Sequence, residues 1–450
     1  MRRPLLVVPL ALSLGLLSLT GTAQAAPRHR VVVMGPGDAS AAVRHAGGTV
    51  ERLLPLLHGA VAELPVGARL PGFVVSPDRA LTPSGRPERG RGKGQPELPS
   101  DEGAGTGVTV AVVDTGVADV PELAGRVTHV DVTGDGVGDG YGHGTFVAGL
   151  VAGSSVGAAP GADVLDVRVG HDDGSTSLVD VLVGLEVVAS HPEVRVLNLS
   201  LSSGSPVEVD PLTIALDQLW ASGVLVVVPA GNDGPGRETV TSPGTDPLLL
   251  TVGGLDTAGT ADRGDDSVAA WSGQGGQGLQ KPDLVAPGAH VVSAAAPGSA
   301  IWTANPGSRV DGGLFVGSGS SFSAALVSGS AAAVLAQRPE LTPDRVKALL
   351  ERSAYDVAGP RRATGAGGLD AARAMTQRAP HAVQPVPESD DLLWDASSWA
   401  ASSWAARQWA ARQWAARQWA ASSWAASSWA ARQWAARQWS ARQWSAVGWE

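Results

Sequence analysis

Four polar side chains stand at the ends of apolar runs or at the starts of helical patterns: Asp114, His143, Asn232 and Ser321. A serine hydroxyl becomes a nucleophile when a base removes its proton, and a neutral imidazole can do this near pH 7. A carboxylate fixes the imidazole tautomer and stabilises the imidazolium that forms. A side-chain amide and a backbone N–H at a helix N-terminus can bind the resulting oxyanion. Together these residue types predict nucleophilic serine catalysis.

Each of these residues alone has a simpler interpretation. An Asp or Asn after a strand is commonly a turn or cap residue, and a serine before an Ala-rich helix is commonly an N-cap. A histidine between two glycines, such as His143, is usually a loop residue. Their joint occurrence in the order Asp, His, Asn, Ser favours the catalytic interpretation.

Alternating apolar runs and helical patterns predict the framework that positions these residues. Strands are expected over the runs 108–113, 164–169, 194–199, 224–228 and 248–252. Helices are expected at 146–152, 177–189, 212–221 and 324–336. Fully apolar strands that alternate with helices are typical of an α/β fold whose mostly parallel sheet is covered by helices on both faces. Functional residues in such sheets gather at the carboxyl ends of the strands.

Residues 105–377 resemble the subtilisin-family serine proteases, the subtilases. The resemblance rests on six blocks: Val112–Gly116, His143–Gly149, Leu197–Ser202, Ala230–Asn232, Pro282–Gly288 and Gly319–Ser323. It implies a subtilisin-like fold and a serine endopeptidase that hydrolyses protein or peptide substrates through an acyl-enzyme intermediate. It also implies site residues: a triad of Asp114, His143 and Ser321, the oxyanion donor Asn232, and substrate contacts at Ser200, Leu201, Ser202 and Gly231.

Three residues depart from the usual family pattern. Ser320 replaces the common threonine before the nucleophile and keeps a hydroxyl. Ala325 stands where a proline is usual in the nucleophile helix, and alanine should preserve that helix. Ser202 replaces a common glycine, which is expected to narrow the site for the residue before the scissile bond.

The N-terminal quarter of the chain is predicted to be removed. Residues 1–25 read as a signal peptide, because Arg2 and Arg3 precede a 5–19 apolar run too short to span a bilayer. Residues 26–84 are expected to form a small ferredoxin-like α+β unit, similar to the inhibitory propeptides of the family, or else an unrelated accessory domain. Residues 85–104 form a Pro- and Gly-rich linker, so cleavage is expected between residues 82 and 107. The protein is therefore predicted to be an exported zymogen, extracellular or associated with the cell envelope, with no transmembrane helix in the mature chain.

Charge and cysteine content exclude several function classes. The formal charge of −10 disfavours a nucleic-acid binder, and the absence of cysteine excludes disulfides, Cys-ligated zinc and thiol catalysis. Residues 27–100 carry ten basic and six acidic residues, whereas 101–385 carry 15 and 32. This difference either favours docking of the first segment on the second or reflects two independent solvated surfaces.

No cofactor is expected to take part in the chemistry, but the resemblance leaves structural calcium open. Asp131, Asp135 and Asp139 lie in a Gly-rich loop whose oxygens could hold calcium. Their spacing does not match an EF-hand, and such loops are commonly solvated turns. The sequence leaves the metal site undecided.

The catalytic region is expected to cover residues 105–378, followed by a Pro-containing linker at 379–393 and a tail at 394–450. In the tail, tryptophan recurs every five residues, so neither a helix nor a strand gathers the rings on one side. We predict a disordered array; a solenoid, or a surface that binds glycan or the cell envelope, are the alternatives. The alternative function is a surface- or glycan-binding protein with a degenerate protease domain and a functional tail, but the intact set of four site residues favours the enzyme.

Overall fold

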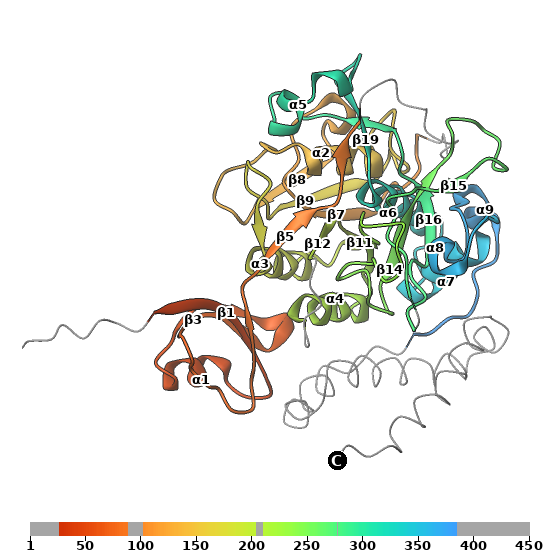
Figure 1. Cartoon of the computed structure of the whole chain (residues 1–450). Helices are drawn as coiled ribbons and strands as arrows, with labels where there is room; N and C mark the ends of the chain where they lie inside the picture. Colours follow the sequence, from red (N-terminus) through yellow and green to blue (C-terminus); the bar gives the residue numbers. More distant parts are fainter. Residues whose placement is uncertain (1–26, 89–101, 204–209, 277, 385–450) are drawn as a thin grey trace, which may run out of the picture.

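The computed structural model describes residues 27–88, 102–203, 210–276 and 278–384. A small N-terminal unit packs against a larger α/β unit, and an extended segment connects the two (Figure 1). The predicted signal peptide, most of the predicted linker and the tryptophan-rich tail lie outside the described residues.

The small unit is an antiparallel sheet covered by one helix. Its sheet has the order β2-β3-β1-β4. The elements are β1 (Arg28–Met34), α1 (Ala39–His45), β2 (Thr49–Leu54), the 3₁₀ turn η1 (Pro55–Leu57), β3 (Gly59–Pro65) and β4 (Val74–Pro77). This strand order is that of a ferredoxin-like unit, but residues 66–73 form turns rather than a second helix. Gly67 and Gly72 have φ values of 85° and 81° there, and Pro71 also disfavours a helix.

Successive side chains of β1 point to opposite faces of the small sheet, so the small unit packs on both faces. Val31 and Val33 face α1 in a small core of their own, whereas Val32 and Met34 join the core of the large unit. Leu57 of η1 is also part of the large core, and η1 contacts both α3 and α4. The first unit is therefore docked through apolar side chains.

The large unit is built on a twisted sheet in which β15-β14-β13-β11-β7-β9-β8 are neighbours and β16 pairs with β14. All these pairings are parallel except that of β15. The strands are β7 (Thr109–Asp114), β8 (Val127–Asp131), β9 (Asp163–Arg168), β11 (Val194–Leu199), β13 (Leu225–Pro229), β14 (Leu250–Asp256), β15 (Ser267–Val268) and β16 (Leu284–Pro287). The central strands are almost wholly buried, as expected for a parallel sheet covered on both faces.

Helices cover the two faces of this sheet. On one face α2 (His143–Ala152) packs against α6 (Ser320–Gln337), and on the other α3 (Leu178–Ala189) packs against α4 (Pro211–Ala221) (Figure 1). The remaining helices are α5 (Ala300–Ala304), α7 (Pro343–Ser353), α8 (Arg361–Thr364) and α9 (Ala371–Thr376). The predicted α/β class, with its mostly parallel sheet, is confirmed, and α6 continues unbroken through Ala325.

Short strands complete the fold around the site. They are β5 (Ala80–Pro83), β6 (Arg86–Pro87), β10 (Thr176–Ser177), β12 (Leu201–Ser202), β17 (Val291–Ala294), β18 (Arg309–Val310) and β19 (Leu314–Ser318), and a 3₁₀ turn lies at each of Pro121–Leu123 and Pro306–Ser308. Within the described ranges, α6 is long and apolar enough to cross a membrane, but 89% of that stretch is buried inside the protein. This helix forms part of the core.

Candidate active site

Asp114 and His143 form a buried hydrogen-bonded pair. Asp114 ends β7 and His143 begins α2, and the imidazole Nδ1 lies 2.7 Å from Asp114 Oδ1. Both side chains are almost completely buried, and the Thr115 N–H also donates to Asp114 Oδ1 at 2.8 Å. Because Nδ1 donates to the carboxylate, Nε2 carries the lone pair of a neutral base. Nε2 has no hydrogen-bond partner within the described part of the chain.

Asp139 ties the start of α2 to the loop after Asp114. Its Oδ1 accepts from Thr115 Oγ1 at 2.9 Å and from Gly142 N at 2.6 Å, and its Oδ2 accepts from Thr145 N and Oγ1 at 2.8 and 2.7 Å. Thr115 Oγ1 in turn accepts the Gly144 N–H at 2.9 Å. One carboxylate thus fixes both backbone segments that carry the Asp114–His143 pair.

We expect Asp139→Asn to change the pH dependence of stability and to lower kcat. Burial raises the pKa of Asp139 to about 6, although four hydrogen bonds oppose the rise. The raised pKa means that ionisation of this group costs folding stability as pH rises from about 4 to about 6, by about 3 kcal/mol. Asparagine does not titrate, so this part of the pH dependence of stability should disappear. Its NH₂ group would face N–H or O–H donors where one Asp139 oxygen now accepts, and this mismatch should displace the start of α2.

Urea unfolding at about pH 4 and about pH 7, together with kcat, tests this prediction. Asp311→Asn is the control, because Asp311 is an exposed carboxylate outside this network. An unchanged pH dependence and an unchanged kcat in Asp139→Asn would contradict it.

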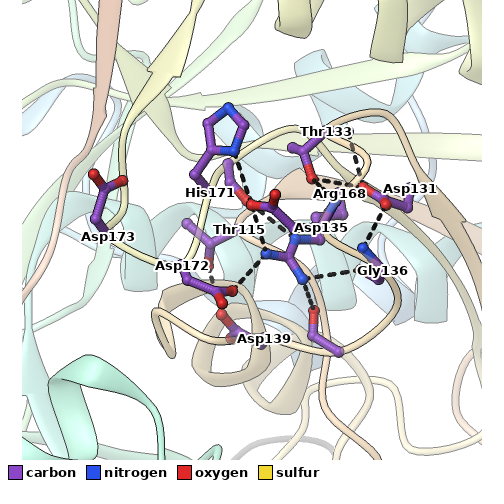
Figure 2. Close-up of polar contacts among 12 residues, drawn as sticks. Thr115, Asp131, Thr133, Asp135, Gly136, Asp139, Arg168, His171, Asp172 and Asp173 are labelled. Atoms are coloured by element: carbon purple, nitrogen blue, oxygen red, sulfur yellow. Dashed lines mark hydrogen bonds and ion pairs between the residues drawn. The ribbon is translucent and has the colours of Figure 1, made fainter.

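The loop that was considered for calcium is held by internal hydrogen bonds and by Arg168 (Figure 2). Asp131 accepts from Thr133 and from the Gly136 N–H, and Asp135 contacts Arg168 and His171. The buried Arg168 guanidinium also donates to the carbonyl of Gly136 at 2.9 Å and to Asp172 at 2.6 Å.

These carboxylates therefore already have partners, and the three aspartates do not converge on one point. In the described ranges, no group of three or more His, Asp or Glu side chains could hold a metal ion. These three aspartate side chains by themselves therefore do not make a calcium site.

Ser321 lies in the first turn of α6, directly after β19 and Gly319. Its hydroxyl donates to the Ser200 carbonyl at 3.3 Å, and within the described residues no hydrogen bond links it to His143. Its backbone N–H donates to the carbonyl oxygen of Ser84 at 3.3 Å. The His143 and Phe322 rings lie with their centroids 5.7 Å apart, so the histidine and the start of α6 are in the same site.

Asn232 donates to the same carbonyl oxygen as the Ser321 N–H. Its Nδ2 donates to the Ser84 carbonyl oxygen at 2.7 Å. Its Oδ1 accepts from the N–H and the hydroxyl of Ser320, at 3.0 and 2.9 Å. The Ser320 hydroxyl therefore helps to orient the Asn232 amide. This is a role for the hydroxyl that Ser320 keeps where the family usually has threonine.

Residues 80–87 run through this site in an extended conformation. β5 pairs antiparallel with β10 on one side, with Leu81 opposite Thr176, and with β12 on the other, with Thr82 opposite Ser202. The Ser84 N–H donates to the Ser200 carbonyl at 3.3 Å, and β6 pairs with β19 beyond the site. The segment thus forms the middle strand between β10 and β12 and passes the Ser321 N–H.

The structure brings most of the predicted site residues together. Ser200, Leu201 and Ser202 border the extended segment, as the resemblance implied for a substrate strand. Gly231 has a φ of 91°, and a side chain there would meet Thr241; it has no hydrogen bond to residues 80–87 in the described structure. The predicted contact of Gly231 with substrate stays a prediction.

Sequence reasoning missed several site residues. Asp139 was considered only for calcium, although its position four residues before His143 was a signal for a role at the start of α2. Thr176 and Ser177, which form the second border of the segment, and the Ser84–Gly85 bond itself were not singled out, because nothing local to their sequence marks them.

The mostly parallel α/β sheet thus carries a buried Asp114–His143 pair beside the start of α6, where Ser321 lies. A family model described as the subtilase family (Peptidase_S8) matches residues 105–367. The chain belongs to the subtilase family.

The chain is similar in sequence to two curated relatives and in fold to one solved structure. The chain is 39% identical over 270 residues to the serine protease AprX of Bacillus subtilis, covering 55% of this chain and 61% of that protein. It is 33% identical over 259 residues to subtilisin Savinase of Lederbergia lenta, covering 56% of this chain and 84% of that protein. The crystal structure of fervidolysin from Fervidobacterium pennivorans, a keratinolytic enzyme related to subtilisin, has a similar fold, with a TM-score of 0.65 and 22% identity over 79% of this chain and 62% of that one.

Proposed function

We propose that the protein is a serine endopeptidase, exported and synthesised as an inactive precursor whose N-terminal unit is its own propeptide. The carbonyl oxygen of Ser84 carries this proposal. It accepts hydrogen bonds from Asn232 Nδ2 and the Ser321 N–H, so that Ser84–Gly85 lies where a scissile bond must lie. The enzyme without residues 28–84 would present the same groups to a protein or peptide substrate.

The proposed reaction has two steps, acylation of Ser321 and hydrolysis of the acyl-enzyme. Ser321 Oγ attacks the carbonyl carbon, His143 Nε2 takes the hydroxyl proton, and Asn232 with the Ser321 N–H stabilises the oxyanion. The C–N bond then breaks as His143 returns the proton to the leaving amine, which leaves an ester on Ser321. Water attacks that ester, again through His143, and releases a carboxylic acid and free enzyme. Before the attack, the Ser321 hydroxyl must turn from the Ser200 carbonyl toward His143.

Docking of the N-terminal unit on α3 and α4 supports its role as an inhibitor. Asp78 Oδ1 accepts the N–H of Val179 in the first turn of α3, and Glu186 Oε1 of the same helix accepts the Leu56 N–H at 2.8 Å. The Arg79 guanidinium lies 2.6 Å from the carboxylate of Asp210, which caps α4. We propose that cleavage at Ser84–Gly85 leaves residues 28–84 bound until they are degraded.

We expect Arg79→Ala to shorten the time during which the propeptide inhibits the enzyme. Both partners of the Arg79–Asp210 pair are largely buried, at 15% and 8% exposure, so solvent screens the pair little. Loss of a hydrogen bond between charged groups should weaken propeptide binding by about 2 kcal/mol, or roughly 30-fold.

The lag before activity appears in freshly secreted protein measures this effect. Arg28→Ala is the matched control, because among the described residues Arg28 donates to Thr49 and Gly47, which belong to the small unit. A lag equal to that of the wild type in Arg79→Ala would show that this pair does not hold the inhibitor.

Labelling with a serine-directed fluorophosphonate tests the proposed function. The mature protein should be labelled at Ser321, and Ser321→Ala should not be. Ser330→Ala is the control, since Ser330 is a buried serine of the same helix whose hydroxyl donates to the Leu326 carbonyl one turn before it. Absence of labelling in the wild type would favour the degenerate, surface-binding alternative.

A further inference from the structure

We infer that the enzyme selects a small residue before the scissile bond and glycine after it, and that Ser202 and Phe322 impose this choice. The inference rests on the proposed function, because it takes residues 84 and 85 as the two residues that flank the scissile bond. It names a substrate class: peptides that contain a small residue followed by glycine, in an extended segment.

The position after the scissile bond has no room for a side chain. A Cβ added to Gly85 would lie 2.6 Å from Phe322 Cζ, 3.0 Å from Phe322 Cε1 and 3.1 Å from His143 Nε2. Carbon atoms attract each other best at about 3.5–4.0 Å, so the first two contacts are repulsive. Even alanine therefore requires either Phe322 or His143 to move, and a displaced His143 cannot act as the base.

The Phe322 ring is held on its other sides as well. It packs against Phe146 with ring centroids 4.2 Å apart, and it is only 4% exposed. A Cβ on Gly317 would lie 2.7 Å from Phe322 Cε2, so the backbone of β19 lies close against the ring on that side. The ring cannot withdraw without opening the core between α2 and α6, which makes it a firm wall rather than a flexible one.

The position before the scissile bond is restricted by a hydroxyl. Ser84 Oγ lies 2.9 Å from Ser202 Oγ, and both residues are buried. A larger side chain in place of Ser84 would collide with Ser202. A larger apolar side chain would also leave the buried Ser202 hydroxyl without the hydrogen bond that Ser84 now provides. Glycine at position 202 would remove the obstacle, so the departure from the family pattern at this residue sets the size of the pocket.

The test compares three peptides with the mature enzyme. The first has the native order Leu-Thr-Pro-Ser-Gly-Arg-Pro; the second has Ala in place of the Gly, and the third has Phe in place of the Ser. We expect kcat/KM to fall about 10- to 200-fold for the Ala peptide, the range found for a difference of one methylene group in a pocket, and by at least as much for the Phe peptide, whose ring is far larger.

Two variants distinguish the effect of Phe322 on the position after the scissile bond from the effect of Ser202 on the position before it. Phe322→Met, whose flexible side chain can yield, should restore cleavage of the Ala peptide but not of the Phe peptide. Ser202→Gly should do the reverse. Phe322→Leu is the second variant at position 322 if Phe322→Met does not fold.

Active sites are counted with the fluorophosphonate before each measurement, which separates failure of the inference from failure of the proposed function. Labelled enzyme that cleaves all three peptides equally, or variants that relax both positions together, would overturn the selectivity and leave the protease assignment standing. Enzyme that is neither labelled nor active on any peptide would overturn both.

Discussion

Ser321→Ala should abolish peptide hydrolysis without unfolding the protein, with kcat lower by about a millionfold, the loss known for the nucleophile of subtilisin itself. The substitution removes only an oxygen atom whose hydrogen bond, to the Ser200 carbonyl, is long at 3.3 Å. The Ser321 backbone N–H, which binds the Ser84 carbonyl oxygen, is unaffected. Residual hydrolysis would come from the oxyanion donors and substrate binding alone.

Turnover of a chromogenic peptide and thermal unfolding by circular dichroism check this result together. The variant should keep the melting temperature of the uncleaved wild-type chain. A purified Ser321→Ala protein that turns over at a rate near that of the wild type would remove the basis for the catalytic assignment.

Asn232→Ala should lower kcat by about 10²- to 10³-fold with little change in KM, again a magnitude measured on subtilisin. The Nδ2–H of Asn232 is the shorter of the two hydrogen bonds to the Ser84 carbonyl oxygen, at 2.7 Å against 3.3 Å from the Ser321 N–H. A donor placed for the oxyanion acts mainly as charge develops, so its loss affects kcat rather than substrate binding.

Ser320→Ala tests whether the orientation of the Asn232 amide matters for catalysis. It keeps the Asn232 amide but removes one of the two hydrogen bonds that orient it, at 2.9 Å from the Ser320 hydroxyl. Its kcat should therefore lie between those of the wild type and Asn232→Ala. A larger loss in Ser320→Ala than in Asn232→Ala would contradict the assigned order of effects.

Periodicity and apolar runs were enough to predict the framework. The predicted strand 194–199 is observed at those bounds, because nearly all of its residues are buried. The helix expected at 212–221 is observed as α4, one residue longer at its N-terminus. Asp114 and His143 could be placed in one site because strands of a parallel sheet end at the same edge. Their hydrogen bond then follows from the geometry of β7 and α2.

Features that depend on contacts distant in sequence could not be predicted. The position of Ser84 between Asn232 and Ser321 joins residues 148 positions apart, and no local pattern marks it. The role of Asp139 stayed open in the sequence, because a carboxylate in a Gly-rich loop looks the same whether its partners are a metal or backbone N–H groups. β16 is short and ends in a proline, and β8 contains only two apolar residues among three polar ones, so apolar runs did not reveal either strand.

The most direct test of the account is mass spectrometry of both products of maturation. We predict that secreted, active protein separates into a fragment that ends at Ser84 and an enzyme that begins at Gly85, and that Ser321→Ala leaves this bond intact. An active enzyme that retains the Ser84–Gly85 bond, or a Ser321→Ala chain cut at that bond in the absence of other proteases, would contradict the account.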